Sequence, residues 1–479
     1  MEKNDKLKKN TVLSAMSLFF QSGYSATLGF GANLLLTILL SPKIFGIYFT
    51  VLAIIAILNY FSDIGLAASL IQKKDITDDD IKTTFTIQQT LILTIVSIGF
   101  LASSFIQSFY DLPQEGIYLF WALLFAFFIS SLKTIPSILL ERKIQFQKIV
   151  IVQIVENTVF YITVMTLALL KYDLMSFTFA VILRSITGLI LIYSLSFWVP
   201  KIGISIKSVK TLLSFGVPFQ ASSFLALFKD ELLILYLGKI LGFESLGYIG
   251  WAKKWAETPI RIIMDNISKV LFPVFSRIQH DTQKISRLIQ KILFYQTTIL
   301  APSILGLALI MSNFIEIIPK YSKWAPALPL LYIFCISAFL SSYSTPFINM
   351  FNALGKVRIS FKFMLAWTIA TWVLTPILTQ TFGLFGFPIT LVILSSSFII
   401  VVTKAKTLIQ FSFIQSIIKP LSAAAVMGII VFAILNINLR TDIKLIISIL
   451  TGALSYFAIL IFIYRINVIN EVKSLFSYK

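Results

Sequence analysis

Apolar runs of about 20 residues recur along the whole chain, and they constrain the fold more than any other feature of the sequence. A helix of that length just crosses a hydrocarbon core of about 30 Å. Besides helices, only closed β-barrels satisfy the backbone in lipid, and the alternating strands of about ten residues that barrels need are absent. We therefore predict an all-α polytopic membrane protein.

The hydropathy pattern predicts fourteen membrane spans joined by short connections, so no soluble domain is expected. A capping box is expected at "TDDD", residues 77–80, where the third span opens. The spans are predicted at 11–40, 45–71, 83–108, 118–140, 147–170, 175–197, 211–238, 245–274, 288–312, 326–352, 360–381, 384–404, 415–437 and 443–465.

Basic residues indicate the orientation of these spans. With the N-terminus inside, cytoplasmic segments collect about 25 of the 40 Lys and Arg residues, as the positive-inside rule requires. The basic start, "MEKNDKLKKN", is then a retained cytoplasmic tail rather than a signal peptide. We predict a multi-pass protein of the cytoplasmic membrane with both termini in the cytoplasm. Its net charge of +19 is interpreted as this bias and an attraction to anionic membrane lipids, not as a nucleic-acid surface.

The sequence holds one cysteine, Cys335, and one histidine, His280. An intramolecular disulfide is impossible, and a metal centre built from His and Cys clusters is excluded. No bound cofactor is predicted.

A faint internal repeat suggests how the spans are grouped. The stretch "LSPKIFGIY" at 40–48 aligns with "LGFESLGYI" at 241–249, an offset close to six spans. Repeated halves are a common plan among transporters. We predict two six-helix lobes, residues 1–210 and 211–411, followed by a terminal helix pair and tail at 412–479.

The segment "WAKKWAETPIRIIMDNISK", residues 251–269, carries charges at steps of three or four inside an apolar span. At 100° per residue these charges share one helix face. Each would cost about 2.5–3.5 kcal/mol in lipid. One interpretation is a closed structural network of opposite charges four residues apart: Lys253 with Glu257, Glu257 with Arg261, and Arg261 with Asp265. The other is a face toward a water-filled cavity, for which the candidate substrate-binding residues are Lys229, Lys254, Glu257, Arg261 and Asp265.

Acidic residues within the spans form a second group of candidates. Carboxylates inside a membrane are the usual relay groups for ions, so Asp63, Asp230 and Glu231 are candidates for coupling transport to an H⁺ or Na⁺ gradient. Alternatively, they only neutralise neighbouring cations such as Lys229 and Arg184.

Four further stretches of the chain stand out: "SDIGLAASLIQKKDIT" (62–77), "IPSILLERKIQFQKI" (135–149), "LLSFGVPFQASSFLALFKDELLILYLGKILGFESLGYI" (212–249) and "ISKVLFPVFSRIQHD" (267–281). These stretches resemble the Wzx-type polysaccharide transporters of the multidrug/oligosaccharidyl-lipid/polysaccharide flippase superfamily. The charges at positions that match the family are Asp63, Glu141, Arg142, Lys229, Asp230 and Arg277.

The resemblance implies an inner-membrane flippase with two six-helix lobes around a central cavity. It would move polyprenyl-diphosphate-linked oligosaccharide to the outer leaflet by alternating access, for the synthesis of a surface polysaccharide. Its partners would be the lipid-linked oligosaccharide and polysaccharide assembly proteins.

Three other functions agree less well with the sequence. A cation or drug exporter of the same superfamily is the main alternative, although its cavity should be rich in acids, and here bases outnumber acids in the spans. An enzyme is not expected, because no loop is large enough to hold a catalytic constellation. A non-transporting scaffold would leave the charged segment unexplained.

Overall fold

The computed structural model describes residues 2–465, and every regular element in that range is helical. Nothing is described of the side chains of residues 2–12, 15, 19, 218, 219, 221–229, 265, 266, 269 and 270. The chain divides into two compact units, Met1–Gly247 and Tyr248–Lys479. The lobe limits near residues 210 and 411 stay predictions.

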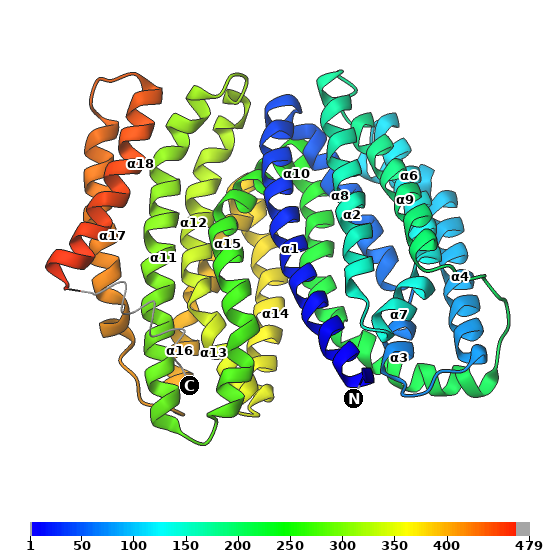
Figure 1. Cartoon of the computed structure of the whole chain (residues 1–479). Coiled ribbons are helices and arrows are strands. Elements are labelled where there is room, and N and C mark those ends of the chain that lie inside the picture. Colours follow the sequence, from blue (N-terminus) through cyan, green and yellow to red (C-terminus); the bar gives the residue numbers. More distant parts are fainter. Residues whose placement is uncertain (1, 466–479) are drawn as a thin grey trace. The chain divides into compact units, whose positions relative to one another are not determined.

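The first unit is a bundle of helices, most of which have axes roughly parallel to those of their neighbours (Figure 1). It contains α1 (Glu2–Leu39), α2 (Pro42–Tyr60), α3 (Leu66–Gln72), α4 (Asp78–Leu101), α5 (Ser103–Tyr110), α6 (Gln114–Leu132), α7 (Thr134–Arg142), α8 (Phe146–Leu169), α9 (Met175–Leu195) and the first part of α10 (Ile206–Arg277).

The second unit begins within α10 and continues in the same style. It contains α11 (Thr282–Ile317), the 3-10 helix η1 (Ser322–Ala327), α12 (Leu328–Ser342), α13 (Ser344–Ala353), α14 (Val357–Phe382), the 3-10 helix η2 (Gly383–Phe385), α15 (Gly386–Ser396), α16 (Phe398–Lys406), α17 (Phe413–Leu435), α18 (Thr441–Ala458) and the π-helical turn η3 (Ile459–Ile463).

The all-α polytopic architecture is confirmed. Eleven stretches of the described residues are long and apolar enough to cross a membrane. The predicted number of fourteen stays a prediction, because the longest of these stretches, Val357–Lys406, joins two predicted spans. Several predicted spans consist of two helices separated by a short break, as α2 and α3 do.

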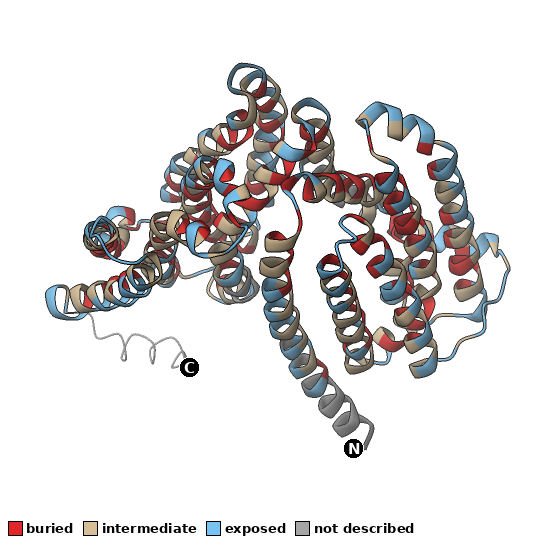
Figure 2. Cartoon of the chain, turned by 90° about the horizontal axis from the view of Figure 1, so that it is seen from above, coloured by how far each residue is buried: buried red, intermediate tan, exposed pale blue. Residues whose placement is uncertain are grey.

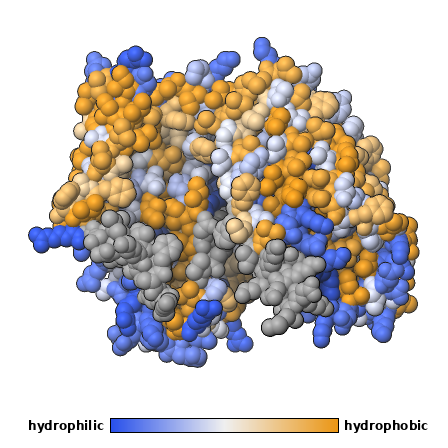
Figure 3. Space-filling model, viewed as in Figure 1, coloured by the Kyte–Doolittle hydropathy of each residue, from blue (hydrophilic) through white to orange (hydrophobic). Residues whose placement is uncertain are grey.

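Large apolar side chains cover the outside of the described helices. Leu101, Phe197 and Phe462 are each about four-fifths exposed, at 81%, 80% and 79%. Buried and exposed residues alternate around individual helices (Figure 2). Hydrophobic residues cover the middle of the helices, whereas hydrophilic residues gather at their ends (Figure 3). Lipid is the solvent that such a surface requires.

The backbone of α10 leaves the helical conformation at Gly242, with φ 78° and ψ 167°. A positive φ is readily adopted by glycine alone. The predicted spans at 211–238 and 245–274 are therefore two helices that meet at a break in the backbone at Gly242.

The internal repeat corresponds to a reciprocal contact inside the first unit. A Cβ added at Gly46 would lie 1.7 Å from the carbonyl oxygen of Phe243, and one added at Gly247 would lie 2.0 Å from that of Pro42. Gly46 aligns with Gly247 in the repeat, and Pro42 aligns with Phe243. The glycine of each copy thus packs against a backbone carbonyl of the other copy. Without side chains at these positions, the two helix starts are in direct backbone contact.

We expect Gly247→Ala to lower the free energy of unfolding by about 1–3 kcal/mol, because the added methyl forces two helix backbones apart. Thermal unfolding of the purified protein measures this loss. Gly31→Ala is the control, since nothing lies within 4 Å of a Cβ there, and alanine is the better helix former. Equal effects of the two substitutions would contradict the close contact.

Candidate functional site

The charged segment of α10 forms two linked ion pairs within the second unit. Glu257 Oε2 lies 3.0 Å from Arg261 Nη2, and Glu257 Oε1 lies 3.8 Å from Lys253 Nζ. The i,i+4 spacing places all three side chains on neighbouring turns. These two predicted pairs are confirmed, whereas the third, Arg261 with Asp265, lies outside the described side chains. The side chain of Arg261 is nevertheless 73% exposed, so most of its hydrogen-bonding edge is not used by the pair.

Lys254 lies beside these pairs and is exposed. Within the described part of the chain it makes no ion pair within 4 Å. Its backbone carbonyl accepts a hydrogen bond from Thr258 Oγ1 at 2.6 Å. The face therefore presents three cations around one carboxylate, which is an excess of positive charge.

The opposite face of this part of α10 is closed. Ala252 and Ala256 are fully buried, and Trp251 donates a hydrogen bond from Nε1 to Tyr321 Oη at 3.0 Å. Trp251 also stacks on Trp324 with ring centroids 5.5 Å apart. These small and aromatic side chains fix the rotation of the helix, and with it the direction of the charged face.

The structure describes only some of the other predicted site residues. The side chains of Lys229 and Asp265 lie outside the described residues. Asp230 is exposed and Glu231 partly exposed on the first part of α10, and neither is free of partners.

Asp63 lies in the turn between α2 and α3, in the first unit. Both carboxylate oxygens accept from the backbone N–H of Ala67, at 3.1 and 3.2 Å, so the carboxylate caps the start of α3. Gln88 Nε2 lies 3.4 Å from Asp63 Oδ1 and 3.3 Å from Thr134 Oγ1. Nothing in the sequence pattern associates Gln88 or Thr134 with this carboxylate.

Glu156, unlike Asp63, is neutralised by a lysine of the first unit. Lys133, at the break between α6 and α7, forms an ion pair with Glu156 of α8, and both side chains are largely buried. Gly188 of α9 leaves the space that the Glu156 carboxylate occupies, since a Cβ there would lie 1.6 Å from Glu156 Oε1. The sequence reveals two opposite charges inside spans, but not that they meet.

Arg142 holds the end of α3. Its guanidinium donates to the carbonyl oxygens of Leu70, Ile71, Lys73 and Lys74 at 2.6 to 2.9 Å. These carbonyls have no partner within a helix that ends there. The neighbouring Glu141 is partly buried, and burial raises its pKa above the usual range. Beyond α3, the expected capping box of Thr77 and Asp80 is confirmed.

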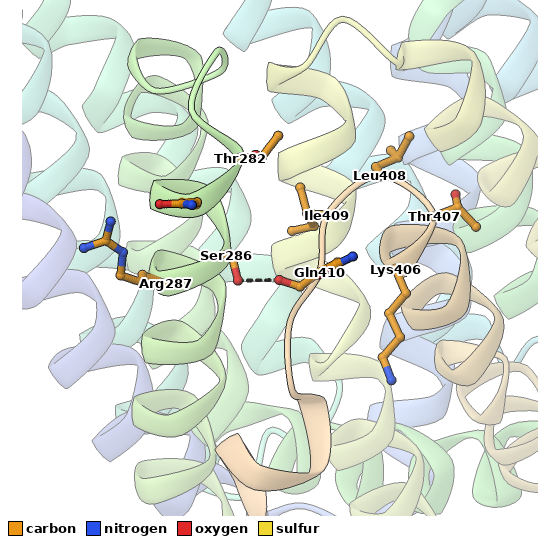
Figure 4. Close-up of a pocket in the computed structure, with 9 residues that line it drawn as sticks. Thr282, Ser286, Arg287, Lys406, Thr407, Leu408, Ile409 and Gln410 are labelled. Atoms are coloured by element: carbon orange, nitrogen blue, oxygen red, sulfur yellow. Dashed lines mark hydrogen bonds between the residues drawn. The ribbon is translucent and has the colours of Figure 1, made fainter.

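A pocket of about 710 Å³ lies in the second unit, between the start of α11 and the loop after α16. Ser286 Oγ donates to the carbonyl of Gln410 at 2.5 Å and ties the loop to the helix. Two cations line the pocket, but Arg287 and Lys406 point away from each other (Figure 4). The pocket therefore does not gather positive charge at one point.

The known proteins with similar sequences carry names that refer to the synthesis or transport of surface polysaccharides. The lipopolysaccharide biosynthesis protein WzxC of Escherichia coli (strain K12) is 27% identical over 321 residues, which are 67% of this chain and 65% of that protein. This chain thus spans just under two thirds of that relative. The teichuronic acid biosynthesis protein TuaB of Bacillus subtilis (strain 168) is 22% identical over 83% of this chain and 84% of its own. The succinoglycan biosynthesis transport protein ExoT of Rhizobium meliloti (strain 1021) is 21% identical over 70% of this chain and 67% of its own.

Two solved structures share the fold. The lipid II flippase MurJ, in an inward closed conformation, superposes with a TM-score of 0.74 at 15% identity, over 95% of this chain and 99% of its own. An inward-facing MATE multidrug transporter of the MOP superfamily superposes with a TM-score of 0.60 at 14% identity, over 79% and 94%. Residues 35–329, more than half of the sequence, match the family described as "Polysaccharide biosynthesis protein". The chain therefore belongs to this family of polysaccharide biosynthesis proteins.

Proposed function

We propose that this protein is a flippase that moves polyprenyl-diphosphate-linked oligosaccharide repeat units across the cytoplasmic membrane by alternating access. The names of its relatives support a role in making O-antigen, capsule or exopolysaccharide, and the fold of the lipid II flippase supports the type of cargo. No covalent chemistry is proposed. Glycan assembly proteins are the proposed partners, and both termini are proposed to be cytoplasmic.

The charged face of α10 carries this proposal. A diphosphate offers several anionic oxygens, and the free edge of Arg261 can donate to them in bidentate fashion. Lys254 lies seven residues earlier, two helical turns away, and adds a second cation that no described side chain neutralises. We propose that Lys254 and Arg261 bind the diphosphate and that Glu257 keeps Arg261 oriented.

The main alternative is a cation or drug exporter, for which the MATE neighbour gives weaker support. An organic cation would meet repulsion from a face with three cations and one carboxylate. Proteoliposomes containing the purified protein separate the two functions. We expect translocation of a fluorescent lipid-linked oligosaccharide and none of a fluorescent organic cation. The reverse result would reject the flippase and favour the exporter.

We further expect the charged face to line the water-filled path that the cargo takes. Single cysteines replacing Lys254 and Arg261, in a Cys335→Ser background, should react readily with a membrane-impermeant thiol reagent. Ala252→Cys and Ala256→Cys are matched controls on the closed face of the same helix, where both residues are fully buried. Equal labelling of the two faces, or none on either, would mean that the charges form a closed structural network.

A further inference from the structure

The turn between α2 and α3 is a strained piece of backbone in the first unit. Ile64 has φ 49° and Gly65 has φ 75°. A β-branched residue in the left-handed region is a genuine outlier and costs about 1–2 kcal/mol. Strain of this kind persists where surrounding contacts hold it, and it concentrates at functional sites. The residue that the turn presents is Asp63.

The Asp63 carboxylate has no cationic partner among the described residues. Its contacts are the Ala67 N–H and the long approach of Gln88 Nε2. Asp63 is half-buried. Removing a carboxylate from water without a counter-charge is costly, so a positive charge at this position would stabilise the unit.

Gln88 brings an unsatisfied oxygen to the same place. The residue is only 4% exposed, and its Oε1 makes no hydrogen bond in the described structure. Thr84, one turn earlier on the same face of α4, is fully buried, and its Oγ1 is also without a partner. An unsatisfied buried polar atom costs about 1–3 kcal/mol. Gln88 thus carries an unsatisfied oxygen on the same amide whose nitrogen approaches a carboxylate that has no counter-charge among the described residues, and such an oxygen calls for a ligand.

These groups lie inside the predicted spans. Gln88 is five residues into the span at 83–108, and Thr134 is six residues before the end of the span at 118–140. At 1.5 Å per residue, both lie about 8–9 Å from the end of a span that crosses a hydrocarbon core of about 30 Å. A functional role is the first hypothesis for an ionisable residue at such a depth.

We propose that Asp63, Gln88 and Thr134 form a binding site for a monovalent cation, Na⁺. All the ligand atoms are hard oxygens, from a carboxylate, an amide carbonyl and a hydroxyl, which suit a hard cation. A single carboxylate balances a single positive charge. The Gln88 amide turns its N–H₂ toward Asp63 when no cation is present, and a half-turn presents Oε1 instead. The site itself does not depend on the proposed flippase function. Only its role does, which is to couple transport to a Na⁺ gradient.

The site also has a mechanical connection. A Cβ at Gly65 would lie 2.2 Å from the carbonyl oxygen of Gly216, so the strained turn lies directly against the first part of α10. Tyr60 Oη donates to the carbonyl of Gln220 at 2.7 Å, and Gln220 Nε2 donates to the carbonyl of Tyr60 at 2.8 Å. A cation bound at the turn therefore lies directly beside contacts with the first part of α10, within the same unit.

The test measures binding of ²²Na⁺ to the full-length protein in lipid nanodiscs, without cargo. We expect saturable binding that weakens by at least about tenfold in Asp63→Asn, Gln88→Leu and Thr134→Val. Gln89→Leu is the matched control, because Gln89 is the next residue and instead bonds to Ser131, at 3.0 Å. Size-exclusion chromatography selects folded variants, and Thr134→Val, which keeps the side-chain shape, covers a failure of Asp63→Asn to fold.

Each result decides the proposal. No saturable Na⁺ binding by the natural protein overturns it, as does binding that Gln88→Leu and Thr134→Val leave intact. Transport that follows the H⁺ gradient in a protein that does not bind Na⁺ overturns it in favour of protonation of a carboxylate. A protein that binds Na⁺ but does not move lipid-linked oligosaccharide keeps the cation site and loses the proposed flippase function.

Discussion

Reversing the charge of Lys254 or Arg261 is expected to reduce export of surface polysaccharide by at least about tenfold. A hydrogen bond to a charged group contributes about 1.5–3 kcal/mol, which corresponds to roughly ten- to hundredfold in binding. A glutamate at either position also repels the diphosphate. Lys254→Met and Arg261→Gln, which remove charge without reversing it, should have intermediate effects. Polymer at the cell surface, normalised to the amount of protein in the membrane, measures the loss.

Loss of fold does not account for such a result. The pair between Arg261 and Glu257 is largely exposed, and exposed ion pairs contribute about 0–1 kcal/mol. Arg358→Glu is the control: it makes the same change of charge at an exposed position on another helix, at the start of α14. Normal export by both charge-reversal variants would show that the α10 face does not bind cargo.

Replacing Glu156 with Gln is expected to lower the free energy of unfolding by about 3–5 kcal/mol. The substitution leaves Lys133 as an unpaired buried cation, which is the costly way to break a buried ion pair. The double variant Lys133→Met/Glu156→Gln should recover most of the loss, because it removes both charges. Thermal unfolding of the purified variants in nanodiscs measures these differences.

An exposed ion pair provides the comparison. Arg440 Nη2 lies 2.9 Å from Asp442 Oδ2, with the arginine side chain 78% exposed, so Asp442→Asn should cost less than about 1 kcal/mol. If Glu156→Gln is as mild as Asp442→Asn, the buried pair is hydrated and does not stabilise the unit. If the double variant is no better than the single one, the loss comes from packing against Gly188 rather than from charge.

The sequence predicts what depends on local spacing. Span positions follow from the length of apolar runs, and the pairs of Glu257 with Lys253 and Arg261 follow from the helical repeat. The Thr77–Asp80 capping box is equally local. Each of these features needs only residues within a few turns of one another.

Features that depend on distant residues could not be predicted. A hydropathy window of about 20 residues does not detect a break such as the one between α2 and α3, because the turn at Ile64 and Gly65 stays apolar. Lys133 meets Glu156, and Gln88 approaches both Asp63 and Thr134, only because separate helices bring them together. The sequence identified Asp63 as a candidate, but nothing local indicates its neighbours.

The reciprocal contact of Gly46 and Gly247 has a consequence for the history of the chain. After a gene duplication, most positions in the two copies meet different neighbours and are free to diverge. Positions at a contact between the copies are different, because each copy forms the other's environment. A larger residue at either glycine meets a backbone carbonyl that cannot retreat, whether that of Phe243 or of Pro42. A substitution in either copy therefore disturbs the same junction, so neither copy can change there independently of the other.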